Sequence, residues 1–191
     1  MAPALAEQNH DRQGAPATEQ NRDRKGAATY LITWVCYGTW LPGQDGAVPR
    51  WQNQFGAPLL EPDTSTEELS RVRMTQPSYL LDAIRRSLVL QTLQEVCSWR
   101  GWTLLAAHVR TNHVHVVTTA NCKPEQVMTA MKAYSSRALN EHSLDGPGRR
   151  RWARHGSTRY LWTKDSVGAA IHYVVREQGE SMAVFEMSFP R

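Results

Sequence analysis

The chain has 191 residues, of which 41% are hydrophobic and 8% aromatic, which is enough apolar material for one compact domain. Its formal net charge is +4 with a pI near 9.1, a basic excess that favours a polyanionic partner. Its three cysteines lie far apart without a C-x-x-C pair, which argues against a disulfide framework or a zinc knuckle. Neither a signal peptide nor an apolar run of membrane-spanning length is visible, so we expect a cytoplasmic protein with no membrane partner.

The N-terminal part of the chain contrasts a polar tail with a strand. Residues 1–27 are rich in Ala, Gln, Asn, Arg and Asp, a composition that predicts a disordered tail before a single domain over 28–191. From Tyr30 the residues on both alternating faces are mostly apolar, which predicts a buried strand ending at the turn around Pro42. A long polar excursion over 44–79 follows, with one short helix whose Ser65 and Glu68 have capping-box spacing.

The remaining elements alternate between helical and strand patterns. Apolar residues recur at helical spacing over 80–99, 124–141 and 167–175, and Gly179 is a natural stop for the last helix. Residues 101–109 and 113–120 predict strands that a tight connection joins into an antiparallel hairpin, and 157–162 predicts another strand. This order predicts an α+β fold, a ferredoxin-like antiparallel sheet with helices packed on one face.

Two histidines flank one valine in the second strand of the hairpin. Side chains two apart on a strand share a face, so His113 and His115 point the same way. Neutral imidazoles at this spacing can bind one divalent ion and leave coordination positions open for water or a substrate oxygen. The alternative for an isolated H-x-H is a polar pair on a solvated strand face.

A tyrosine in the helix over 124–141 is the candidate partner of this pair. From His115 to the strand end is about 17 Å at strand rise, and from Glu125 to Tyr134 is about 14 Å at helix rise. If the helix packs back antiparallel across the sheet, Tyr134 returns to the level of the histidines, where a phenol beside a metal ion can act as a nucleophile. The alternative is an ordinary core tyrosine on an apolar helix stripe.

These motifs resemble a known family. The segments "NHVHVV" and "KAYSSRALN" are similar to the HUH single-tyrosine (Y1) transposases of the insertion-sequence-200-like superfamily, most of all those associated with repetitive extragenic palindromes. The resemblance implies an HUH endonuclease-like fold and a Mg²⁺- or Mn²⁺-dependent single-stranded DNA endonuclease and strand transferase. In such an enzyme a tyrosine attacks a DNA phosphate, forms a 5′-phosphotyrosine and releases a 3′-hydroxyl. It maps His113 and His115 onto the metal ligands and Tyr134 onto the nucleophile.

One position departs from the family pattern. Many relatives have a polar metal ligand one helical turn after the tyrosine, where this chain has Ala138. Glu141 lies on nearly the same helix face as Tyr134 and is the alternative third ligand; Asn140, His155 and water are the others.

A basic, aromatic segment follows the helix that carries Tyr134. Its arginines suit phosphate contacts and its aromatic rings suit stacking on unpaired bases, the combination expected for a single-stranded or hairpin DNA groove. For the aromatic residues, anchoring of a solvated loop to the core is an equal alternative. The candidate DNA-binding residues are Arg149, Arg150, Arg151, Arg154, Arg159 and Trp152.

Two other classes of function stay open on the sequence alone. One is a mononuclear metal-dependent phosphodiesterase that uses a water nucleophile, with Tyr134 merely packed. The other is a domesticated DNA-hairpin-binding protein without turnover. The sequence is equally compatible with a monomer and a homodimer.

Overall fold

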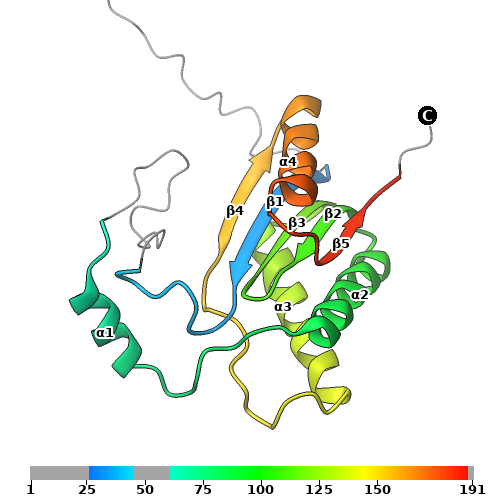
Figure 1. Cartoon of the computed structure of the whole chain (residues 1–191). Coiled ribbons are helices and arrows are strands. Elements are labelled where there is room, and N and C mark those ends of the chain that lie inside the picture. Colours follow the sequence, from blue (N-terminus) through cyan, green and yellow to red (C-terminus); the bar gives the residue numbers. More distant parts are fainter. Residues whose placement is uncertain (1–25, 45–60, 189–191) are drawn as a thin grey trace, which may run out of the picture.

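The computed structural model describes residues 26–44 and 61–188, so the predicted tail over 1–27 lies almost wholly outside the described residues. The described chain forms a five-stranded sheet in the order β4-β1-β3-β2-β5, in which every pairing is antiparallel (Figure 1). The strands are β1 (Ala28–Val35), β2 (Thr103–Val109), β3 (His113–Ala120), β4 (Ser157–Leu161) and β5 (Ala183–Glu186). The helices are α1 (Thr64–Val72), α2 (Ala83–Arg100), α3 (Pro124–Glu141) and α4 (Lys164–Arg176).

The predicted α+β class and ferredoxin-like antiparallel sheet are confirmed. The succession β1, α2, β2, β3, α3, β4 places β1 and β3 at the centre of the sheet, as that topology requires. The short strand β5 was not predicted from the sequence, and it extends the sheet beyond β2. The excursion contains the predicted short helix, α1, but its N-cap is Asp63, whose carboxylate accepts from the backbone N–H groups of Ser65 and Thr66.

Capping residues in the sequence explain where the helices α2, α3 and α4 begin or end. Asp82 caps the start of α2, and Gly101 ends it in the left-handed conformation, with φ of 67°. Pro124 occupies the first turn of α3, where its missing N–H costs nothing. Thr163 caps α4 by accepting a hydrogen bond from the Ser166 N–H.

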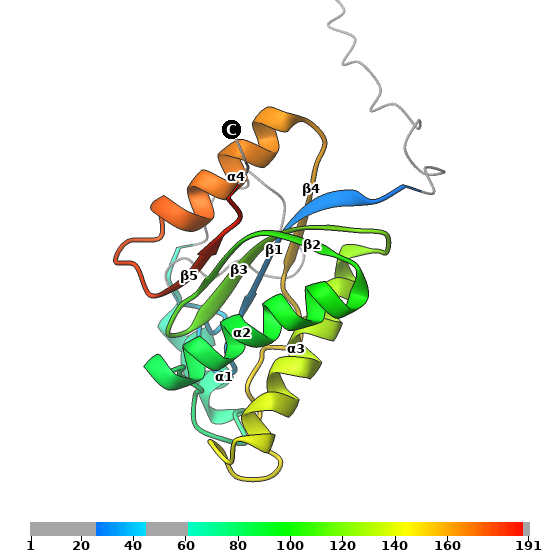
Figure 2. The same ribbon diagram turned by 90° about the vertical axis from the view of Figure 1, so that its right-hand side faces the viewer.

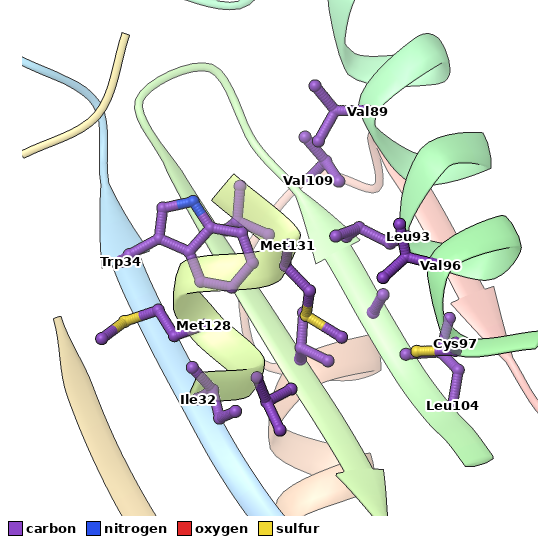
Figure 3. Packing of buried hydrophobic residues seen from close by; sticks show 14 of the residues in the cluster. Ile32, Trp34, Val89, Leu93, Val96, Cys97, Leu104, Val109, Met128 and Met131 are labelled. Carbon is purple, nitrogen blue, oxygen red and sulfur yellow. The ribbon is translucent and has the colours of Figure 1, made fainter. Parts of the chain in front are cut away.

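The larger core lies between one face of the sheet and the helices α2 and α3 (Figures 2 and 3). Trp34 and Ile32 of β1 pack there with Leu93 of α2 and Met131 of α3, and all four side chains are fully buried. Val114 and Val116 of β3 belong to the same core. The even-numbered residues of β3 therefore face α2 and α3.

The opposite face of the sheet is covered by α4, which corrects the prediction that the helices pack on one face (Figure 2). The second face carries the apolar side chains of Leu105, Val117 and Leu161. They are covered by Ala170 and Val174 of α4. The reason is that α4 follows the completed ferredoxin-like unit, whose second face would otherwise expose these side chains to water.

Candidate active site

His113 and His115 lie side by side on the face of β3 that α4 covers. Their ring centroids are 4.8 Å apart, so the prediction that the two imidazoles share a face is confirmed. Both side chains are buried, within a sheet whose neighbouring strands β1 and β2 flank them. The pair is therefore not on a solvated strand face.

Each imidazole is oriented through its Nδ1 atom by a neighbour that the sequence did not single out. The His113 Nδ1 lies 2.7 Å from the Asn112 side-chain oxygen, which can only accept, so this nitrogen donates. The His115 Nδ1 lies 2.7 Å from the Thr33 hydroxyl, across the β1–β3 pairing. These partners leave the two Nε2 atoms for other bonds, the arrangement usual for metal-binding histidines.

Both rings are held neutral. The pKa of His113 is lowered to about 4 and that of His115 to about 3, mainly by burial and to a smaller extent by nearby positive charge, including that of Arg110. Only the neutral imidazole has the lone pair that a metal ion needs. The environment therefore keeps the pair ready to act as ligands at neutral pH.

Gln178, just beyond α4, provides a third polar group at the histidines. Its side chain interacts with both imidazoles and, as a smaller effect than burial, raises their pKa. Its amide nitrogen donates to the Tyr173 carbonyl oxygen at 3.1 Å. Among the residues that the structure describes, no group of three His, Cys, Asp or Glu side chains is placed to hold a metal ion.

The tyrosine at this site is Tyr173 of α4. Its ring centroid lies 5.6 Å from that of His115, edge to face, and the residue is 40% exposed. Sequence reasoning missed it because it lies on the flank of the apolar stripe of α4 and belongs to no recognised motif. The sequence held one signal that could have found it: the strands are apolar on a second face, which an amphipathic helix must cover, and α4 is such a helix.

The prediction that Tyr134 lies beside the histidines is wrong. Tyr134 packs against Trp99 of α2, with ring centroids 5.6 Å apart, and against the core between the sheet and α2 and α3. Its helix, α3, lies on the opposite face of the sheet from α4 (Figure 2). The two distances used for the prediction nearly cancel, but they say nothing about which face the helix covers. The connection after β3 takes α3 to the side of Val114 and Val116, which puts the sheet between Tyr134 and His115.

The alternative third ligand, Glu141, is separated from the histidines for the same reason. It lines a groove between α2 and α3 together with Tyr134, Ala138 and Trp99. Asn140 uses its side-chain oxygen to accept from Arg151 at 2.7 Å. The prediction of Glu141 as a ligand beside the histidines is therefore wrong, and Ala138 does not lie beside the histidines.

A third histidine fixes the position of α4. His108 is fully buried, and its Nδ1 lies 3.0 Å from the carbonyl oxygen of Val174, a residue next to Tyr173. Its Nε2 accepts from the backbone N–H of Met182 at 3.3 Å. Both ring nitrogens are thus used, so His108 supports the site and has no free nitrogen for a metal ion.

Two of the predicted DNA-binding arginines have structural roles. Arg151 is 4% exposed and donates to the Asp145 carboxylate at 2.9 Å and to Asn140 at 2.7 Å, which corrects its assignment to a DNA surface. Arg149 donates to the backbone oxygens of Pro77 and Ser78 and so ties the loop before α2 in place.

The other arginines are exposed, as a phosphate-binding role requires. Arg150 and Arg154 lie on the surface of the loop after α3, and Arg159 lies on β4. Trp152 is anchored instead: its indole N–H donates to the Lys132 carbonyl and the Ser136 hydroxyl, and its ring packs edge to face on the core residue Trp34. The alternative of a loop anchor is thus the correct one for Trp152.

Two exposed aromatic rings lie at the edge of the sheet. Tyr160 and Trp162 stack with centroids 4.8 Å apart and an interplanar angle of 14°. Strand β4 pairs with β1 on one side and is the outermost strand on the other. The pair therefore offers a flat apolar surface next to Arg159.

Fold and site together define an α+β protein in which two imidazoles and a tyrosine lie on one face of a central strand and form a candidate active site. The family model for IS200-like transposases matches residues 76–176, more than half of the chain. The chain belongs to this family of transposases, as the sequence motifs predicted.

The comparison with solved structures finds a weak similarity. The structure of a REP-associated tyrosine transposase bound to a REP hairpin covers 80% of this chain and 67% of its own, with a TM-score of 0.44 and 8% identity. A similarity of this degree transfers no site residue. No curated protein matches the chain. Within residues 26–44 and 61–188, no helix is long and apolar enough to cross a membrane.

Proposed function

We propose that this IS200-like transposase cleaves and rejoins single-stranded DNA through Tyr173. The observation that carries the proposal is the contact between the Tyr173 ring and His115, with Gln178 near both imidazoles. The phenol oxygen attacks a DNA phosphate, the bond from phosphorus to the 3′ oxygen breaks, and a 5′-phosphotyrosine and a 3′-hydroxyl result. The phenol proton leaves to solvent, and the departing 3′ oxygen gains one.

The residues present fit a divalent ion such as Mg²⁺ or Mn²⁺. Two neutral imidazoles and one amide oxygen are uncharged donors, and Asn112 and Thr33 orient the rings from behind. His113, His115 and Gln178 would hold the ion, and water would complete its coordination. When bound, the ion would supply Lewis-acid polarisation of a phosphate oxygen.

The protein side chains supply the rest of the chemistry. Tyr173 is 40% exposed and so can reach a substrate phosphate, and His108 fixes the helix turn that carries it. Arg110, whose charge acts on both histidines, offers a positive charge for the substrate phosphate. Because histidines, glutamine and tyrosine come from one chain, we propose that a monomer contains a complete site.

The substrate class follows from charge and exposed aromatic rings. Arg150, Arg154 and Arg159 are exposed around the loop after α3 and on β4, where they suit a phosphate backbone. The stacked pair Tyr160 and Trp162 suits unpaired bases. We propose single-stranded or hairpin DNA as the partner, and the cytoplasm as the compartment in which such a substrate is met.

The deciding experiment compares two conservative tyrosine variants. Wild type, Tyr173→Phe and Tyr134→Phe are each incubated with labelled single-stranded hairpin DNA and Mn²⁺ and run on a denaturing gel. Tyr173→Phe should fold, bind DNA and lose both cleavage and the covalent protein–DNA species, whereas Tyr134→Phe should retain both.

Each other outcome has a definite reading. Loss of the adduct in Tyr134→Phe alone would restore the nucleophile predicted from the sequence. Cleavage without an adduct in all three proteins would favour the phosphodiesterase that uses water, and DNA binding without cleavage by wild type would favour the domesticated binder.

A further inference from the structure

Trp40, in the loop that follows β1, stacks on one of the candidate metal ligands. Its ring centroid lies 5.1 Å from that of His113, with an interplanar angle of 28°. The His113 ring contacts His115, which in turn contacts Tyr173. Four rings therefore form a row, with the proposed nucleophile at one end and an indole at the other.

The indole is held in this place at a cost to the backbone. Trp40 adopts φ of 52°, the left-handed region that residues with a side chain rarely enter. Such a conformation costs on the order of 1 kcal/mol and persists where the surroundings impose it, often at functional sites. The residue is nevertheless 45% exposed, so burial of the ring does not explain the strained backbone.

The loop around Trp40 is tied to the strand that carries the histidines. The Cys36 N–H donates to the Asn112 carbonyl at 2.7 Å, and the Thr39 hydroxyl donates to the Cys36 carbonyl at 2.8 Å. The same Asn112 holds the Nδ1 of His113 with its side chain. A shift of the loop would therefore disturb His113 as well.

The other side of the loop is packed against the polar excursion. A side chain at Gly38, with φ of 72°, would meet the Ser78 backbone at 2.9 Å, and one at Gly43, with φ of 92°, would meet the Asp63 carbonyl at 2.3 Å. Gln44 donates to Glu67 of α1 at 2.9 Å. Trp40 thus sits in a loop that is fixed on both sides before any ligand binds.

We infer that Trp40 forms a base-stacking subsite of the active site, with its inner face on His113 and its exposed face open to an unpaired nucleobase of single-stranded DNA. A flat, preorganised indole beside the site of phosphate attack gains stacking energy from any base and loses little conformational entropy. A strand laid along the row of rings would bring a phosphate to Tyr173 and a nearby base to Trp40. The inference rests on the proposed function, because it presupposes a single-stranded DNA substrate.

The test measures DNA binding without cleavage. Full-length wild type, Trp40→Ala, Trp40→Phe and Trp99→Ala are titrated in EDTA against a fluorescein-labelled 20-nucleotide single strand of mixed sequence. Trp99 is the matched control, since it is 68% exposed but lies on α2 across the sheet. Trp40→Ala should weaken binding about 5- to 150-fold, the range expected for loss of one base stack, while Trp40→Phe keeps most affinity and Trp99→Ala is unchanged.

A scan with one abasic sugar at a time identifies the stacked nucleotide. One abasic position should weaken wild-type binding as much as Trp40→Ala does, and should weaken the Trp40→Ala protein no further. Unchanged affinity of Trp40→Ala, or an abasic penalty that simply adds to that of the mutation at every position, would overturn the subsite. Absence of binding by wild type would instead overturn the proposed function itself, and the subsite with it.

Discussion

Replacing Arg151 tests whether this residue supports the fold or binds DNA. The sequence assigned it to a DNA surface, whereas the structure buries it against Asp145 and Asn140. Arg151→Met keeps a flexible side chain of comparable length but leaves the buried Asp145 carboxylate without its closest guanidinium. We therefore expect a loss of stability and no specific loss of DNA affinity.

The magnitude follows from the partners that Asp145 retains. Removing one member of a buried ion pair costs about 3–5 kcal/mol when the other is left uncompensated. Asp145 still accepts from the Tyr79 hydroxyl at 2.6 Å and from Arg85 at 3.2 Å, which places the cost near the lower limit, about 3 kcal/mol. For a chain of this size the corresponding fall in Tm is about 6–12 °C.

The assay is urea and thermal unfolding followed by circular dichroism. Arg150→Met is the matched control, because Arg150 is adjacent and exposed, and its stability should change by no more than about 0.5 kcal/mol. The double variant Arg151→Met with Asp145→Asn should lose less than the two single losses combined, since it removes the unpaired charge. An Arg151→Met protein of unchanged stability but weakened DNA binding would refute the structural role and restore the role predicted from the sequence.

Three further predictions concern charge, pH and the composition of the site. Burial holds the pKa of His113 near 4 and that of His115 near 3, below the ordinary 6.5, so as the pH falls the unfolded chain takes up protons before the folded chain does. The stability of the metal-free protein should therefore be fully present above pH 6.5 and fall as the pH drops towards 4, and the urea midpoint of His115→Gln should depend less on pH. Replacing Arg150 and Arg154 with Ala should weaken DNA binding for many sequences alike and reduce its salt dependence by about one counterion for each phosphate that is no longer neutralised. If the slope of log affinity against log salt concentration is unchanged in an anisotropy titration, these arginines do not bind phosphate. A mixture of Tyr173→Phe and His115→Gln proteins should not cleave hairpin DNA if each site forms within one chain, whereas restored cleavage would indicate a site shared across a dimer.

Local patterns in the sequence determined the elements of this protein. The apolar period over 124–141 coincides with α3, and the strand pattern over 113–120 coincides with β3. The succession of elements was then sufficient to predict the ferredoxin-like sheet, because short connections between antiparallel neighbours leave few alternatives. The short strand β5 escaped prediction because four residues carry too little periodicity to distinguish a strand from a loop.

The shared face of His113 and His115 was also determined locally, since side chains two apart on a strand always point the same way. Which helix covers that face was not. Tyr134 and Tyr173 both lie on amphipathic helices, and the rise per residue gives the height of a helical residue along the sheet but not its side. The side depends on how apolar surface on both faces of the sheet is buried, which involves β1, β2, β3 and β4 at once.

The tertiary structure alone decided the members of the site outside β3. Gln178 and Trp40 are distant in sequence from the histidines. They reach them because the C-terminal end of α4 and the loop that leaves β1 both lie near His113 and His115. The role of Arg151 was decided in the same way, since only burial beside Asp145 distinguishes it from the exposed Arg150. The sequence gives each residue its charge or aromatic ring. Whether that group faces water, a partner or a substrate depends on long-range packing, which local patterns do not encode.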